Sequence, residues 1–158
     1  MLHFRQILAP TDFSNYSNHA IQYAAGLARQ FGATLVLLHI VTKDALESIS
    51  KAHVPLYPVD KIYENLAQEI REQYAGNVRP DVRTGLEMKT LVLLGDPSLQ
   101  IVRATQLWGV DLIVMATHGR AGLSHAMMGS VTEKVIRKAP CPVLSLRPVG
   151  MEAAVSTA

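Results

Sequence analysis

Short apolar runs of strand type alternate along this chain with segments of helical periodicity. Residues 35–41 are almost uninterruptedly apolar, which is typical of a parallel strand covered by helices on both faces. Similar runs predict four further strands, at residues 6–10, 90–94, 112–115 and 143–146. Because parallel neighbours need right-handed helical connections, this alternation restricts the chain to an α/β fold.

The intervals between these strands have helical spacing. Apolar residues recur every three or four positions in residues 14–31 and 63–74, in a segment that begins after Pro97, and in a last segment that ends before Pro140. Residues 42–60 contain two prolines and show no clear periodicity. We expect them to form a mobile loop, with part of a helix at most.

Five parallel strands joined by helices predict a single doubly wound α/β domain, a five-stranded parallel sheet with helices on both faces. The strand order 3-2-1-4-5 belongs to this class. In that order the first and fourth strands are neighbours, and ligands bind outside the carboxyl ends of the strands at such a switch point. The turn at residues 10–12 and the loop at residues 116–129 are therefore expected to face one crevice.

Composition limits the classes of function. The 158 residues are 49% hydrophobic, so we expect one domain over residues 1–148, followed by a disordered tail over residues 149–158. The net charge is +2 and basic residues are interleaved with acidic ones, which argues against a nucleic-acid-binding stripe. Because no signal peptide and no apolar run of about 20 residues is evident, we expect a cytoplasmic protein without a membrane partner. Cys141 is the only cysteine, which excludes an intramolecular disulfide.

A glycine-containing loop follows the fourth expected strand and precedes the last helix. Gly119, Gly122 and Gly129 let the backbone approach a ligand closely. Ser130 to Glu133 has the S-x-x-E form of a helix capping box. The free N–H groups and the positive dipole end of a helix that starts near Ser130 favour an anion such as phosphate. Neither the Walker A nor the Rossmann glycine pattern is present.

Several side chains near the expected crevice allow more than one interpretation. Asp12 can accept a hydrogen bond from a ribose hydroxyl or an adenine amino group, or it can cap the helix that follows. His118 can donate to a phosphate or be an exposed loop residue without a role. His39 ends a strand of buried type, which indicates a hydrogen-bonded core histidine. Asp96, His118 and Arg120 leave slow nucleotide hydrolysis or transfer as an alternative, but no catalytic nucleophile and no metal site is evident.

The segment from Ala116 to Ser130 resembles the signature of the universal stress protein family, G-x2-G-x9-G-S/T. Gly119, Gly129 and Ser130 match this signature. The first glycine of the signature is replaced by Ala116. Further segments that resemble the family are residues 7–14, 37–40 and 95–97, so that the likeness covers most of residues 3–147.

This resemblance implies a regulatory protein of the stress response that binds ATP or AMP, with or without Mg²⁺, and does not turn the nucleotide over efficiently. It places adenosine against the first two strands, the ribose beside the end of the fourth strand, and the phosphates against the glycine loop and the last helix. The implied contacts are Pro10, Thr11, Asp12 and Ile40 for adenosine, Met115 and Ala116 for the ribose, and His118, Gly119, Gly129, Ser130, Val131 and Thr132 for the phosphates.

The fifth strand lies at an edge of the sheet in the expected order. An apolar edge strand invites pairing, so this position and the resemblance both predict a homodimer through residues 143–146. The methyl group of Ala116 can crowd a ribose. A second hypothesis therefore stays open, in which the protein binds no nucleotide and acts as a homodimeric interaction or chaperone-like stress protein.

Overall fold

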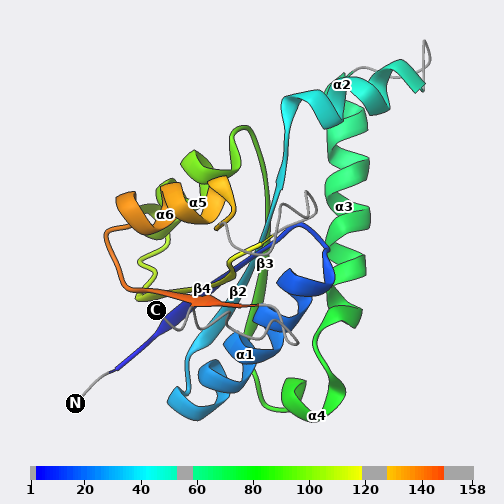
Figure 1. Cartoon of the computed structure of the whole chain (residues 1–158). Helices are drawn as coiled ribbons and strands as arrows, with labels where there is room; N and C mark the ends of the chain where they lie inside the picture. Colours follow the sequence, from blue (N-terminus) through cyan, green and yellow to red (C-terminus); the bar gives the residue numbers. More distant parts are fainter. Residues whose placement is uncertain (1–2, 53–58, 119–127, 148–158) are drawn as a thin grey trace, which may run out of the picture.

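The computed structural model describes residues 3–52, 59–118 and 128–147. Its strands are β1 (Gln6–Thr11), β2 (Thr34–Val41), β3 (Met88–Leu94), β4 (Leu112–Ala116) and β5 (Val143–Leu146). Its helices are α1 (Asn15–Phe31), α2 (Lys43–Ala52), α3 (Val59–Asn77), α4 (Pro80–Arg83), α5 (Pro97–Leu107) and α6 (Ser130–Lys138). The strands form one parallel sheet in the order β3-β2-β1-β4-β5, which confirms the predicted fold class (Figure 1).

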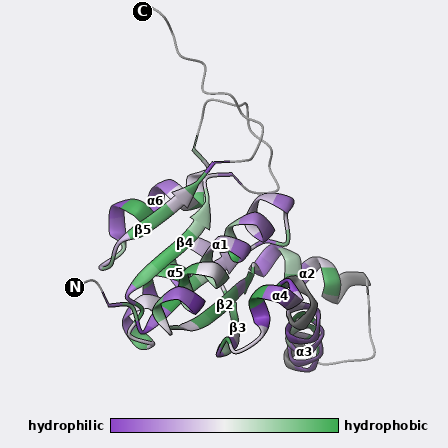
Figure 2. Cartoon of the chain, turned by 90° about the horizontal axis from the view of Figure 1, so that it is seen from below, coloured by the Kyte–Doolittle hydropathy of each residue, from purple (hydrophilic) through white to green (hydrophobic). Residues whose placement is uncertain are grey.

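Alternate residues of the strands enter two separate cores, one on each face of the sheet. Ile7, Leu35 and Val114 belong to the core that α1 and α3 cover. Leu8 and its strand neighbours on the other face belong to the core that α5 and α6 cover. Each fully buried Leu or Ile stabilises the fold by about 1.5–3 kcal/mol. The strands show the strongest apolar colouring in Figure 2 because they consist mainly of such residues.

The segment expected to form a loop is mostly helical. Lys43–Ala52 forms α2, and α3 begins at Val59. The Thr42 hydroxyl accepts a hydrogen bond from Ala45 N–H at 3.2 Å, and Leu46 is buried against the core. The prediction is wrong here because it gave more weight to the two prolines than to Leu46 and Ile49, which are three positions apart and pack in the same core. Residues 53–58 lie outside the described part of the chain.

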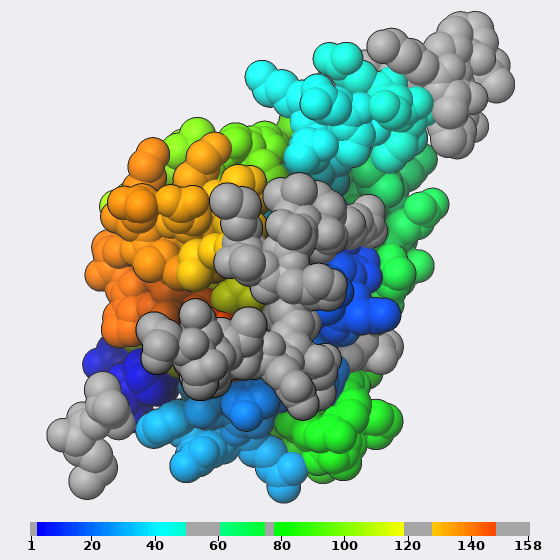
Figure 3. Space-filling model, in the orientation of Figure 1, coloured from blue at the N-terminus to red at the C-terminus, as the bar shows by residue number. Residues whose placement is uncertain are grey.

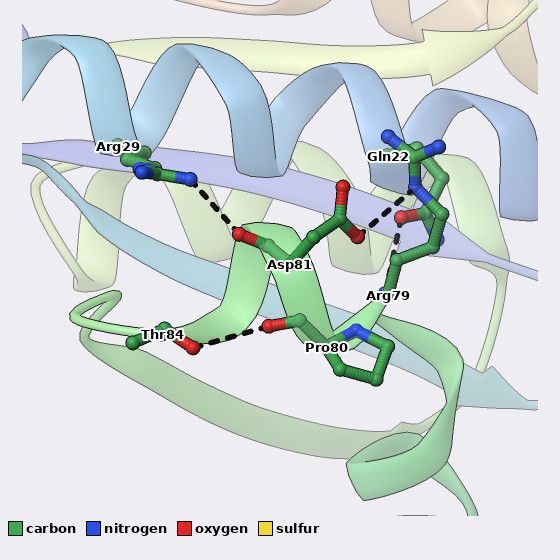
Figure 4. Close-up of polar contacts among 6 residues, drawn as sticks. All are labelled: Gln22, Arg29, Arg79, Pro80, Asp81 and Thr84. Atoms are coloured by element: carbon green, nitrogen blue, oxygen red, sulfur yellow. Dashed lines mark hydrogen bonds and ion pairs between the residues drawn. The ribbon is translucent and has the colours of Figure 1, made fainter.

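Helix α4 was not predicted. It attaches the segment between α3 and β3 to α1 (Figure 4). The Arg29 guanidinium donates to the backbone oxygen of Asp81 at 2.9 Å. The Arg79 N–H donates to the Gln22 side-chain oxygen at 3.2 Å. Val82 adds a buried side chain to the core. These contacts hold a helix of one turn whose sequence contains no helical repeat of its own.

The carboxyl ends of β1 and β4 lie side by side, as the switch point requires. Ile7 pairs with Leu112 and Leu8 pairs with Ile113 in the register of the two strands. Helix α1 starts just after β1, and α6 follows β4. In Figure 3 the start of α1, in bright blue, lies on the right of the molecule, and α6, in orange, lies on the left. Among the described helices, none is both long and apolar enough to cross a membrane.

Candidate functional site

A cleft of about 340 Å³ opens where β1, β2 and β4 end. Every predicted site residue that the structure describes lines this cleft. They are Pro10, Thr11, Asp12, Ile40, Met115, Ala116, His118, Gly129, Ser130, Val131 and Thr132. Gly119 lies outside the described residues. The turn at residues 10–12 and the described ends of the segment 116–129 therefore line one cleft.

Four further residues line the cleft that were not predicted as site residues. They are Ser17, His39, Pro97 and Ile101. Pro97 and Ile101 come from α5, which starts at the carboxyl edge of the sheet just after β3. His39 and Pro97 lie in the segments 37–40 and 95–97 that resemble the family, which is the signal that could have placed them at the cleft.

Hydroxyl groups build the turn between β1 and α1. The Ser14 hydroxyl caps α1 by accepting from Ser17 N–H at 3.1 Å. Ser14 N–H in turn donates to Asp12 Oδ1 at 3.0 Å. The alternative in which Asp12 caps this helix is thus wrong, because Ser14 has that role. Asp12 holds the turn from outside the helix, at the lining of the cleft.

Phe13 supports the same turn through its ring. Its φ of 63° lies in the left-handed region, and it is the one described residue other than glycine with a positive φ. That conformation costs roughly 1–2 kcal/mol for a residue with a Cβ. The Phe13 ring lies 4.7 Å from the His39 ring and 5.2 Å from the Tyr74 ring, and this packing stabilises the turn. His39 Nδ1 donates to the backbone oxygen of Thr11 at 2.8 Å, as expected of a hydrogen-bonded histidine.

The start of α6 differs from the predicted capping box. Gly129 is the N-cap, and it has no side chain with which to cap the helix. Ser130 is the first helical residue, and Glu133 pairs with Arg137 at 3.0 Å. The boundary lies one residue earlier because Gly129 N–H donates to the backbone oxygen of Thr117 at 2.7 Å. A Cβ at position 129 would lie 3.1 Å from that oxygen, so this close approach favours glycine.

His118 has a buried atom without a partner. Its Nδ1 lies 2.9 Å from the Thr117 hydroxyl. Its Nε2 is buried and has no hydrogen-bond partner among the described residues. Buried polar atoms are nearly always paired, so this nitrogen is a candidate donor to a ligand in the cleft. The unpaired Nε2 of His118 fits a phosphate group as a polar partner. Gly129 fits it because no side chain stands between the backbone and the ligand.

The charged groups around the cleft are few. Asp12 is the only carboxylate among the described lining residues, and none of them is Lys or Arg. Burial raises the pKa of Tyr74 well above its usual range, and the negative charge of Asp12 raises it further.

Asp96 does not line the cleft but caps α5, where hydrogen bonds from Ser98 and Leu99 lower its pKa. In the described part of the chain, no group of three or more His, Cys, Asp or Glu side chains could hold a metal ion.

Comparison with known proteins gives consistent matches over nearly the whole chain. A sequence model of the universal stress protein family matches residues 3–147. YxiE of Bacillus subtilis is 31% identical over 149 residues, which cover 91% of this chain and 99% of that protein. A universal stress protein of Thermus aquaticus is 33% identical over 147 residues, again 91% of this chain and 99% of the relative. The solved structure of MJ0577 from Methanocaldococcus jannaschii has a TM-score of 0.77 at 25% identity and covers 95% of this chain and 100% of its own.

Two solved structures of universal stress proteins contain a nucleotide. One is a complex with cAMP, which has a TM-score of 0.61 and 17% identity and covers 92% of this chain and 98% of its own. The other, from Archaeoglobus fulgidus, is a complex with dAMP, which has a TM-score of 0.53 and 23% identity and covers 92% of this chain and 98% of its own. At these identities the likeness shows a shared fold.

Proposed function

The chain belongs to the universal stress protein family, and from this premise we propose that it is a cytoplasmic regulatory protein of the stress response that binds ATP or AMP. The observation that carries the proposal is the meeting of two kinds of group in one cleft. Apolar side chains and the Asp12 carboxylate form one part of the lining, and the first turn of α6 forms another. This combination suits a ligand that joins an apolar base to a sugar and an anion.

The adenosine part of the ligand fits the side of the cleft formed by β1 and β2. Pro10 and Ile40 supply apolar surface against which an adenine ring can lie. Asp12 can accept a hydrogen bond from a ribose hydroxyl or from the adenine amino group. The cAMP and dAMP complexes of two relatives support an adenine nucleotide as the class of ligand.

The phosphate part fits the start of α6. The N–H groups of Ser130 and Val131 have no acceptor within their own helix, and the helix dipole favours an anion there. The unpaired Nε2 of His118 provides a further polar group beside them. Gly119 of the signature is proposed to complete the phosphate site. Any Mg²⁺ would bind through the phosphates of the nucleotide.

Binding is proposed to occur without efficient turnover. Phosphoryl transfer needs positive charge to neutralise the transferred group, together with a residue that orients the nucleophile. None of the described lining residues is Lys or Arg, so the cleft is better suited to holding a nucleotide than to cleaving it. Ordering of the cleft around the ligand would then change the surface that is presented to a partner protein.

Isothermal titration with ATP, AMP and adenosine tests the proposal, and a phosphate-release assay tests its second half. We expect both nucleotides to bind more tightly than adenosine, and the assay to show negligible release. A nucleotide at 100 times its dissociation constant should stabilise the fold by about 2.7 kcal/mol. No heat and no thermal shift at millimolar nucleotide would overturn the proposal, and turnover near the ~10 s⁻¹ typical of enzymes would establish catalysis.

A second candidate, a homodimeric interaction protein without a nucleotide, rests on Ala116. This residue lines the cleft where the family signature has its first glycine, and its side chain is buried at the end of β4. Ala116→Gly should leave ATP affinity equal or slightly stronger if the methyl group crowds the ribose. A wild-type protein that binds no nucleotide, together with an Ala116→Gly variant that does, would favour the second candidate.

A further inference from the structure

We propose that the Thr132 hydroxyl positions the nucleotide site and does not itself bind the phosphate, a role that rests on the function proposed above. Two hydrogen bonds tie the start of α6 to the end of β4. Thr132 Oγ1 donates to the backbone oxygen of Ala116 at 2.8 Å, and Gly129 N–H donates to the backbone oxygen of Thr117 at 2.7 Å. This pair of bonds is called the α6 clamp below.

The Thr132 hydroxyl does not donate to the phosphate, because its proton is already used in another hydrogen bond. A threonine hydroxyl has one proton, and that of Thr132 already has a buried acceptor in the Ala116 carbonyl. Only lone pairs remain on the oxygen, and a phosphate oxygen needs a donor. The residue is 4% exposed, so moving its proton to a ligand would leave a buried carbonyl without this bond.

The clamp instead fixes the direction of the groups between its two ends. Gly129 is the N-cap and Thr132 is the third helical residue, and their acceptors belong to consecutive residues of β4 and its extension. Two bonds of this kind restrict both the position and the tilt of the first turn. The N–H groups of Ser130 and Val131 lie between them and are therefore held in place before a ligand arrives.

Such a device is needed because no side chain caps this helix. The first turn of a helix without a cap frays easily, since its N–H groups have no internal partners. A frayed turn would have to be ordered when the phosphate binds, which would weaken phosphate affinity. The adenosine side of the cleft comes from β1 and β2, so the clamp should affect it little.

Thr132→Val tests the clamp, because valine keeps the shape of threonine and removes the hydroxyl. We expect AMP affinity measured by titration calorimetry to fall at least fivefold, while adenosine affinity stays within twofold of the wild type. Thr132→Ser should restore AMP affinity. The matched control is Thr105→Val, since Thr105 is also buried in a helix and its hydroxyl donates to the Val102 carbonyl at 2.6 Å in α5. This control should leave both affinities unchanged.

A measurement without ligand tests independently whether the α6 clamp orders the start of the helix. Amide hydrogen exchange of Gly129 and Glu133, whose N–H groups donate to the Thr117 and Gly129 carbonyls, should become at least tenfold faster in Thr132→Val and stay unchanged in Thr105→Val. Equal losses of AMP and adenosine affinity, or unchanged exchange, would overturn the positioning role. Wild-type protein that binds neither AMP nor adenosine would overturn the proposed function, and the exchange rates would still show whether Thr132 orders the start of α6.

Discussion

Gly129 shows at the scale of one residue how the cleft depends on the absence of a side chain. Its φ is −60°, so the requirement for glycine comes from the approach to the Thr117 carbonyl and not from a left-handed backbone. Gly129→Val should lower ATP affinity at least tenfold, which corresponds to about 1.4 kcal/mol, with a nearly unchanged circular dichroism spectrum. Gly26→Val is the control, because a Cβ at Gly26 on α1 would meet nothing within 4 Å. Unaltered ATP binding in Gly129→Val would show that Gly129 is not part of the phosphate site.

Tyr74 supplies a prediction about stability at the same scale. Its side chain is fully buried, and its hydroxyl has no hydrogen-bond partner among the described residues. An unpaired buried hydroxyl is destabilising, so Tyr74→Phe should raise the free energy of unfolding by about 1 kcal/mol, measured by urea titration. A decrease of similar size would show that the hydroxyl has a partner.

The pH dependence of Tyr74 follows from the direction of its pKa shift. Burial, and then the charge of Asp12, raise the pKa in the folded state above the ordinary tyrosine value. The folded protein therefore keeps this proton where the unfolded chain releases it. Wild-type stability should fall as the pH rises above about 10, and Tyr74→Phe should lose less stability over that range. Parallel curves for the two proteins would contradict this assignment.

At the scale of elements, prediction from sequence succeeds where many side chains agree. The strands are identified because nearly every residue of a run such as Leu35 to Ile40 is buried. The helices between them require a parallel sheet, and its order is one of those that this class of fold adopts. Helix α2 escapes prediction because its helical signal is one short apolar pair, Leu46 and Ile49. Helix α4 escapes it because one turn is held by contacts with α1, such as the bond from Arg29.

The two ends of the cleft illustrate the same limit. The segments that form it could be predicted, since a strand order alone brings the ends of β1 and β4 together. The start of α6 could not be predicted to the residue. The S-x-x-E pattern is a local signal, and a bond from Gly129 to Thr117, which lies across the loop, overrides it. Long-range hydrogen bonds of this kind leave no periodic trace in a sequence.

At the scale of the whole molecule, the open edge of the sheet at β5 predicts a homodimer. Leu144 on this strand is 36% exposed, and no described strand pairs with β5 on its outer side. Sedimentation equilibrium at tens of micromolar should give a dimer for the wild type and a monomer for Leu144→Lys. Leu107→Lys is the control, because Leu107 is 69% exposed on α5 and should not affect association. A monomeric wild type would exclude this interface.

The central claim is that the first turn of α6 holds the phosphate of an adenine nucleotide. The most direct test is a ¹⁵N–¹H titration of the protein with AMP and, separately, with adenosine. The amide signals of Ser130 and Val131 should shift with AMP and remain almost still with adenosine, while signals of the turn around Asp12 should shift with both. AMP binding detected by calorimetry without any shift of the Ser130 and Val131 amides would contradict the account.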